Sequence, residues 1–221
     1  MSCREILEYL FIVYLVTIIL FSPVIILLCI ITSMILQCVY KQFWYLFIEI
    51  GISCLYVCWV YYDHHTESRG GRSSERCRKF CIWKPIARYF PLKLIKTEDL
   101  DPNRNYIFAY HPHGIIPWGA AMNFYTDATH FSTLFPNIRP HLMSLRSNFF
   151  APIIREIYLS LGGCSVSKES INYLLSGQQG QGHAVVIVTG GEREQRLTKE
   201  DAMILYLKNR RGFIKLALEN G

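Results

Sequence analysis

The stretch "AVVIVTGGERE", residues 184–194, joins a short apolar run to a polar glycine turn. Its first part, Ala184 to Val188, is a continuous run of small and β-branched residues, which is typical of a strand covered on both faces of a sheet. A second short apolar run, Tyr106 to Tyr110, lies between "DPNRN" and "HPHG" and also predicts a buried strand. The domain that contains them is therefore expected to be built around a sheet with both faces buried.

Helices are predicted between and after these strands. Lys168 to Leu175 follows Ser167, and Thr198 to Asn209 begins with Thr198 as its N-cap and has Asp201 three residues later. Strands that alternate with helices are typical of α/β architecture, in which ligands bind beyond the carboxyl ends of the strands. Because "HPHG" and "TGGERE" both follow strands, we expect the two motifs to face one crevice.

The N-terminal part of the chain is far more apolar than the rest. Ile6 to Tyr40 is an almost unbroken apolar run, and Phe43 to Tyr62 is a second one that carries Glu49. A helix needs about 20 such residues to cross the hydrocarbon core of a bilayer. Only the polar break Gln37 to Gln42, with the charge of Lys41, separates the two runs. This part is therefore expected to form a membrane anchor of one or two transmembrane helices, and a helical hairpin is favoured.

Two alternatives to the hairpin follow from the same pattern. A cleavable signal peptide is disfavoured, because its apolar region has about 7–15 residues and ends in an A-x-A-like site. One long span, tilted or kinked at Pro23 and followed by an interfacial segment, remains open. Basic residues after the second run predict a cytosolic location for that segment, and hence for both chain ends of a hairpin. These residues are Arg69, Arg72, Arg76, Arg78, Lys79, Lys84, Arg88, Lys93 and Lys96.

The predicted organisation has three parts: a membrane anchor (1–62), a basic juxtamembrane linker with the start of the domain (63–105), and an α/β core (106–221). The basic linker accounts for the formal net charge of +6. Without an RNA-binding signature or zinc-finger spacing, this charge favours a lipid surface or a phosphorylated ligand, and no nucleic acid partner is expected. The eight cysteines fit a reduced, cytosol-facing domain. Cys77 and Cys81 lack a second ligand pair for zinc, and their palmitoylation stays open.

The motif "HPHG" contains the candidate catalytic residues His111 and His113, with Pro112 between them and Gly114 after them. A neutral imidazole can take a proton from a hydroxyl near pH 7, while proline restricts the backbone and glycine permits a substrate to approach closely. Two alternatives stay open, namely histidines solvated in a loop and histidines that bind zinc. No third ligand has a matching spacing, so no metal is predicted.

Two carboxylates follow the second strand. Glu192 and Glu194 come just after Gly190 and Gly191, and either glutamate could orient a histidine through the ring nitrogen that is not used in the reaction; surface glutamates are the alternative. The serine motif G-x-S-x-G is absent, which argues against a covalent acyl-enzyme. Neither a P-loop nor G-x-G-x-x-G occurs, which argues against nucleotide hydrolysis and dinucleotide redox chemistry.

Six motifs occur in the order found in the diacylglycerol acyltransferase type 2 family, which the chain resembles from Arg69 to Gly221. They are "RGGR" at 69–72, "YFP" at 89–91, "YIFAYHPHG" at 106–114, "FPNIRP" at 135–140, "REIYLSLGG" at 155–163 and "RRGFIKLAL" at 210–218. The resemblance implies an O-acyltransferase that moves a fatty acyl group from acyl-CoA to the hydroxyl of diacylglycerol or monoacylglycerol, forming triacylglycerol. The family also includes wax-alcohol acyltransferases. Acyl-CoA is a co-substrate, and no cofactor is implied.

The resemblance also implies roles for the candidate residues. One histidine is the general base, and Glu194 matches the acid of the family's Gly-Gly-x-x-Glu motif. The His-x4-Asp pair of the wider glycerolipid acyltransferases is absent, since His111 is followed at that spacing by Ile116 and His113 by Trp118. We assign His113 as the base and His111 as its support, with exchanged roles as the alternative.

Substrate binding is assigned to backbone amides and to basic side chains. Amides after Gly114 or at Gly190 and Gly191 would hold the oxyanion of the transition state. The basic side chains would meet the phosphates of coenzyme A, with a solvated basic face as the alternative. The residues assigned to substrate binding are Pro112, Gly114, Gly190, Gly191, Arg210, Arg211 and Lys215.

The expected location is the endoplasmic reticulum membrane, as a multi-pass protein with its catalytic part facing the cytosol. The resemblance leaves open a lipid-droplet surface and a homo-oligomer. In the family, the stretch resembling "RRGFIKLALENG" is followed by further sheet, so the core from 106 to 221 is expected to be incomplete. An alternative function is therefore a catalytically inactive, membrane-anchored partner that binds lipid or a longer relative.

Overall fold

The computed structural model describes residues 3–40 and 44–220. The chain divides into two compact units. One comprises Met1–His65 and Ala151–Ile154, and the other comprises Thr66–Phe150 and Arg155–Gly221.

The N-terminal unit is built from the two apolar runs. They form helices α1 (Cys3–Tyr40) and α2 (Trp44–Tyr62). Helix α2 has 19 residues, so it is about 28 Å long at about 1.5 Å per residue, and by length and composition it could cross a membrane. Within α1, Val24–Tyr40 forms a shorter apolar helical segment. The predicted turn residues Lys41 and Gln42 lie outside the described residues.

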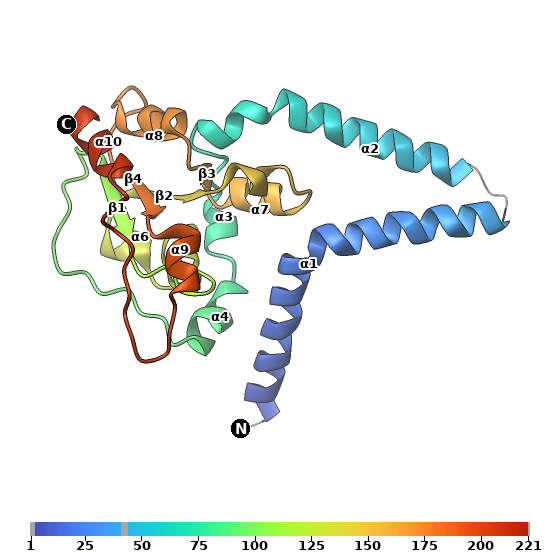
Figure 1. Ribbon diagram of the computed structural model, residues 1–221, viewed down its shortest axis with the longest axis horizontal. Coiled ribbons are helices and arrows are strands. Elements are labelled where there is room, and N and C mark those ends of the chain that lie inside the picture. The colour runs from blue at the N-terminus through green and yellow to red at the C-terminus, as the bar shows by residue number, and fades with distance from the viewer. Residues whose placement is uncertain (1–2, 41–43, 221) are drawn as a thin grey trace. The chain divides into compact units, whose positions relative to one another are not determined.

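Helix α1 is bent part-way along its length (Figure 1). Pro23 lies inside this helix and has no backbone N–H to donate to the preceding turn. Proline is the usual cause of a sharp bend in a helix. A proline inside α1 is therefore a sufficient cause of such a bend.

The second unit contains a four-stranded sheet in the order β1-β4-β2-β3, and all three strand pairs are parallel. The strands are β1 (Tyr106–Tyr110), β2 (Arg139–Ser144), β3 (Cys164–Ser165) and β4 (His183–Val188). The first strand has the predicted bounds, and the strand predicted at Ala184 begins one residue earlier. The predicted α/β class with a parallel sheet is confirmed.

Short helices and helical turns connect the strands. They are η1 (His64–Ser68), α3 (Glu75–Arg78), α4 (Trp83–Tyr89), α5 (Trp118–Ala120), η2 (Ala121–Tyr125), α6 (Phe131–Leu134), η3 (Arg146–Phe149), α7 (Ile154–Ser160), α8 (Lys168–Leu175), α9 (Gly191–Arg196) and α10 (Gly212–Asn220). Helix α8 has the predicted bounds, and the Ser167 side chain caps it by accepting a hydrogen bond from the Ser170 amide.

The helix predicted from Thr198 to Asn209 is wrong. The segment has no helix and contains only a bridge between Lys199 and Ala202, followed by extended chain and a turn. The Tyr206 amide donates to the side chain of Glu194, and so it is not available to a helical carbonyl. A buried carboxylate therefore overrides the local helix preference of this segment.

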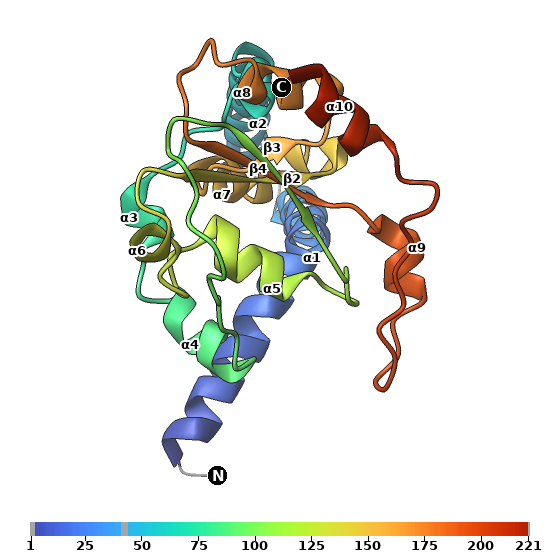
Figure 2. The same ribbon diagram turned by 90° about the vertical axis from the view of Figure 1, so that its left-hand side faces the viewer.

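Both faces of the sheet are covered, as the apolar strands predicted (Figure 2). Successive residues of β4 alternate between the faces, as in any strand. Ala184 and Val186 pack in one cluster with residues of α5, η2 and α6. Val185 and Ile187 pack in a second cluster with residues of α8 and α10. Because helices cover both faces, a ligand would reach the sheet at the carboxyl ends of its strands.

Candidate active site

The register of the sheet brings the two predicted motifs together. Strands β1 and β4 pair in parallel, with Tyr110 opposite Val188 as the last pair. The next residues along the two strands are His111 and Thr189, so "HPHG" and "TGGERE" leave the sheet side by side. Both motifs therefore lie at the same edge of the sheet, where the crevice was predicted.

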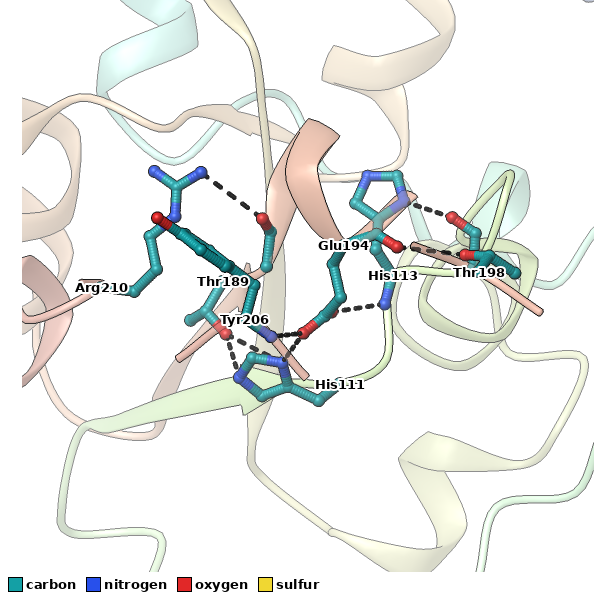
Figure 3. Close-up of polar contacts among 9 residues, drawn as sticks. His111, His113, Thr189, Glu194, Thr198, Tyr206 and Arg210 are labelled. Atoms are coloured by element: carbon teal, nitrogen blue, oxygen red, sulfur yellow. Dashed lines mark hydrogen bonds and ion pairs between the residues drawn. The ribbon is translucent and has the colours of Figure 1, made fainter. Parts of the chain in front are cut away.

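The Glu194 carboxylate joins the segments of this site (Figure 3). Its side chain is buried on α9, and the residue is only 1% exposed. Oε1 accepts hydrogen bonds from His111 Nδ1 and from the Tyr206 amide, both at 2.9 Å. Oε2 accepts one from the His113 amide at 2.7 Å. The carboxylate thus contacts both histidines, but only one of their rings.

The surroundings of Glu194 keep it ionised. Burial alone would raise its pKa, but hydrogen bonds from the Tyr206 amide, the His111 ring and the His113 amide together lower the pKa below its ordinary value. At neutral pH, Glu194 is therefore a carboxylate that can only accept hydrogen bonds. This fixes the tautomer of neutral His111, because Nδ1 must carry the proton that is donated to Oε1.

Thr189 faces the other nitrogen of the His111 ring. Its Oγ1 lies within hydrogen-bond distance of Nε2. Because Nδ1 carries the proton, Nε2 accepts a hydrogen bond from the Thr189 hydroxyl. A hydroxyl, an imidazole and a carboxylate are thus aligned, as in hydrolase triads. Sequence reasoning missed Thr189, although a hydroxyl residue directly after a buried strand was a visible signal.

His113 is held differently. Its Nδ1 lies 2.8 Å from the Gly114 carbonyl oxygen, which can only accept, so Nδ1 carries the proton of the neutral ring. No carboxylate contact to this ring is recorded among the described residues; Glu194 contacts only the His113 amide. Pro112, between the two histidines, is exposed. The geometry therefore favours His111, and not His113, as the ring oriented by the acid.

Two glycines are required by the geometry of the site. A side chain at Gly190 would overlap the Glu194 carboxyl group, as a Cβ built there shows. Gly191 has a φ of +56°, which side-chain-bearing residues rarely adopt, and a Cβ there would lie 3.4 Å from Arg210 Nη2. The pair therefore lets α9 begin close enough to β4 for Glu194 to reach the histidines.

Replacing Gly190 by alanine should impair the site without unfolding the domain. The new methyl group would displace the Glu194 carboxylate, which would lose its hydrogen bond to His111. If the site is catalytic, we expect a loss of turnover of about 10²-fold, comparable to losing the help of a general base. Gly212→Ala is the control for adding a methyl group at a glycine, since a Cβ there would meet nothing within 4 Å and the residue does not have a positive φ. Full activity of the Gly190→Ala variant would show that Glu194 need not contact His111.

Basic and aromatic side chains form the outer wall of the site. The Arg193 guanidinium lies 5.0 Å from the centre of the Tyr206 ring, and that of Arg210 lies 5.7 Å from it. Arg210 also donates to the Gly190 carbonyl at 3.4 Å. The structure therefore brings Arg210 to the site and adds Arg193, which sequence reasoning missed because it assigned only the basic residues after residue 209.

Other predicted residues lie elsewhere on the surface. Lys215 Nζ is 3.8 Å from Glu219 on α10, and Arg211 is exposed just before that helix. Glu192 pairs with Arg196 at 2.5 Å, and both side chains are more than two-thirds exposed. Of the two glutamates proposed to orient a histidine, Glu194 is the one that contacts both. Within residues 3–40 and 44–220, no group of at least three His, Cys, Asp or Glu side chains is placed to hold a metal ion.

Comparison with known proteins agrees with the motifs at this site. The family model described as "Diacylglycerol acyltransferase" matches residues 42–221. Diacylglycerol O-acyltransferase 2 from Danio rerio is 51% identical over 171 residues, which are 77% of this chain and 47% of that protein. The Homo sapiens protein of the same name is 46% identical over 170 residues, 77% of this chain and 44% of that protein. Diacylglycerol O-acyltransferase 2-like protein 6 from Bos taurus is 45% identical over 183 residues, 83% of this chain and 52% of that protein.

The chain thus spans about half the length of the curated relatives it matches. No solved structure matches it significantly. The family model covers the whole α/β unit, including both motifs at the strand ends and the residues that surround Glu194. The chain belongs to the diacylglycerol acyltransferase family.

Proposed function

We propose that the chain carries the catalytic site of an acyl-CoA-dependent O-acyltransferase of neutral lipid synthesis. The acyl group would pass from acyl-CoA to the hydroxyl of a diacylglycerol or monoacylglycerol, and diacylglycerol as acceptor would yield triacylglycerol. The observation that carries this proposal is the His111 ring, held between the buried Glu194 carboxylate and a hydroxyl. That arrangement suits a general base that activates an alcohol.

His111 is the general base in this proposal. The acceptor hydroxyl approaches Nε2 beside the Thr189 hydroxyl and gives its proton to Nε2, while its oxygen attacks the carbonyl carbon of the thioester. The resulting oxyanion then collapses, the carbon–sulfur bond breaks, and the thiolate of coenzyme A takes the proton from the imidazolium. Glu194 stabilises that imidazolium, because its carboxylate accepts a hydrogen bond from Nδ1.

The remaining residues of the site bind the substrates. Backbone amides at Gly190 and Gly191 hold the oxyanion, since preorganised amides stabilise charge that develops in the transition state. Arg193 and Arg210 meet phosphate groups of coenzyme A, for which guanidinium groups are suited.

Labelled acyl-CoA and an acceptor lipid test this function. The purified chain in lipid nanodiscs is given acyl-CoA with a labelled acyl group, together with diacylglycerol, monoacylglycerol or a fatty alcohol. We expect label in the product of one of these acceptors, and none when the acceptor hydroxyl is methylated. Absence of transfer to every acceptor, by protein that stays folded and bound to membranes, would favour an inactive, lipid-binding partner.

Thr189 should position the ring of His111 through its hydroxyl. Thr189→Val keeps the shape of the side chain but removes the donor to Nε2, so the ring is held through Nδ1 alone and the kcat is expected to fall by about 10-fold, about 1.4 kcal/mol. Thr189→Ser restores the hydroxyl and should recover most of the activity. A Thr189→Val variant with an unchanged kcat and pH profile would show that the hydroxyl has no role in the reaction.

Anchoring in the endoplasmic reticulum membrane is part of the proposal. Helices α1 and α2 would form a hairpin with both chain ends in the cytosol, because the basic segment after α2 is costly to translocate. In sealed microsomes, we expect added protease to digest an N-terminal tag and the α/β unit together. Protection of the tag alone would indicate a single span, and the same assay after membrane permeabilisation is the control.

A further inference from the structure

A cavity of about 220 Å³ lies between α1 and α2 of the N-terminal unit. Its lining residues come from the end of α1 and the start of α2: Ser33, Leu36, Gln37, Tyr40, Tyr45, Ile48 and Glu49. An apolar cavity of roughly 150 Å³ is enough to admit benzene in an engineered protein. The space between the helices is therefore large enough for the headgroup of a small lipid.

Three polar side chains in this cavity form one chain of hydrogen bonds. The Gln37 amide nitrogen donates to the Ser33 hydroxyl at 3.0 Å. The Ser33 hydroxyl in turn donates to Glu49 Oε1. Because Ser33 gives its single proton to Glu49, Gln37 must contribute an N–H to Ser33, and the Gln37 carbonyl oxygen is left over.

That carbonyl oxygen is buried and lacks a donor. Gln37 is only 6% exposed, and its Oε1 has no hydrogen-bond partner among the described residues. Folded proteins rarely leave a buried acceptor unpaired, because the group has lost its hydration without replacement. The cavity therefore lacks one hydrogen-bond donor, which a bound molecule would supply.

The surroundings restrict the chemistry of that molecule. The carboxyl group of Glu49 disfavours fatty acids and phospholipid phosphates, and the unsatisfied Gln37 Oε1 is an acceptor. Leu36 and Ile48 line the cavity and are 50% and 56% exposed, so acyl chains can lie against them. The occupant that fits is an uncharged lipid with a free hydroxyl.

We propose that this cavity binds a mono- or diacylglycerol, whose hydroxyl donates a hydrogen bond to Gln37 Oε1. The choice of an acylglycerol among hydroxylated lipids rests on the proposed function, in which it is the acyl acceptor. The cavity is a binding site in the anchor and contains none of the catalytic residues. It gives the anchor a second role beyond holding the protein at the membrane.

Helix pairing alone does not account for this arrangement. A polar cluster that only joined two helices would satisfy its own acceptors, whereas Gln37 Oε1 has no partner within residues 3–40 and 44–220. None of the described residues of α2 is buried, so Glu49 can be reached from outside the unit. Ionisable residues in apolar membrane helices are costly and usually serve a function.

A photoreactive acylglycerol tests the proposal without any reaction. The probe is a diacylglycerol with a diazirine in one acyl chain, added to the full chain in phosphatidylcholine nanodiscs in the absence of acyl-CoA. We expect the label in the peptide that contains residues 33–49. The same probe with its hydroxyl methylated should label that peptide about 10-fold less or weaker still, because its oxygen cannot donate to Gln37.

Variants locate the interaction. Gln37→Leu should reduce labelling by the hydroxylated probe about 10-fold, whereas Glu49→Gln keeps an acceptor for Ser33 and should retain labelling. Thr32→Val is the matched control, since the Thr32 hydroxyl bonds to the Leu28 carbonyl of its own helix at 2.8 Å. If Gln37→Leu fails to fold, the comparison of the two probes on the unaltered protein still shows whether the lipid hydroxyl is recognised.

Each result supports or overturns the proposal. Equal labelling by the two probes, or full labelling of folded Gln37→Leu, would show that the cavity does not recognise the hydroxyl. His111→Ala should label normally, because the cavity does not contain that residue. If the chain transfers acyl groups but its labelling does not depend on the hydroxyl, the lipid-binding cavity is overturned and the proposed function stands. If labelling depends on the hydroxyl but no acyl group is transferred, the proposed function is overturned and the lipid-binding cavity stands.

Discussion

Replacing His111 by alanine is expected to lower the turnover of acyl transfer by about 10²-fold or more, within the usual range of general base catalysis. The His111 ring is the one whose Nδ1 is held by the ionised Glu194 carboxylate, which leaves Nε2 to accept a proton. Without this ring, the acceptor hydroxyl would have to attack the thioester unassisted. The KM for acyl-CoA should change little, because the basic residues proposed to meet its phosphates remain.

His113→Ala is the matched comparison. Alanine keeps the backbone amide that donates to Glu194 and removes only a ring bonded to the Gly114 carbonyl. We therefore expect a much smaller loss, within about 10-fold. The rates are measured as initial velocities with labelled acyl-CoA, in this chain or in a longer protein that contains it. A large loss for His113→Ala with near-normal activity of His111→Ala would restore His113 as the base.

Acidification is expected to destabilise the α/β unit through a second histidine pair, away from the active site. His141 and His183 are 5% and 6% exposed, and Nε2 of His141 lies 3.0 Å from Nδ1 of His183. Nδ1 of His141 faces the Gly162 carbonyl at 3.2 Å, so its Nε2 accepts the N–H of His183. This hydrogen bond requires His141 to be neutral.

The pKa of His141 is lowered to about 3, chiefly by burial and by the neighbouring His183. Arg78 and Arg139 lower this pKa to a smaller extent, and a hydrogen bond to Gly162 opposes the shift. Burial likewise lowers the pKa of His183. Between about pH 6.5 and 3, the unfolded chain therefore binds more protons than the folded chain. Stability is full above pH 6.5 and falls by about 1.4 kcal/mol per pH unit as the pH decreases, for the proton of His141 alone.

The measurement is thermal unfolding of the α/β unit within the whole chain, followed by tryptophan fluorescence between pH 7.5 and 5. This window avoids the titration of Glu194, whose stabilising contribution is lost only as the pH falls below about 4.5. His141→Asn should flatten the pH dependence. His130→Asn is the control, because His130 is exposed and its φ of +64° suits asparagine. A pH dependence unchanged by His141→Asn would exclude the pair as its source.

The strands and the neighbouring positions of the two motifs at their ends were predictable because their signals are local. Five consecutive apolar residues before "HPHG", and five before "TGGERE", predict strands that the structure confirms. The position of each motif directly after its strand was enough to expect a shared crevice, since parallel strands end at the same edge. The helix α8 and its Ser167 cap were predictable for the same reason.

The segment from Thr198 to Asn209 shows where local reasoning failed. Its residues favour a helix, but one of its amides is bound to Glu194, and the buried carboxylate gains more from that bond than the segment gains from helix formation. The partner lies 12 residues earlier in the chain and inside another element. Such a contact leaves no periodic pattern in the sequence.

The composition and order of the motifs indicated the α/β class, the apolar N-terminal helices, and the residues His111, His113 and Glu194 as one set. Which ring receives the carboxylate depended on folding, because His111 and Glu194 are 83 residues apart and meet only when β1 pairs with β4 and Gly190 lets α9 approach. Thr189 and Arg193 join the site for the same reason. A sequence specifies residue types and local periodicity, whereas hydrogen bonds of a buried carboxylate depend on distances of a few tenths of an ångström that packing alone sets.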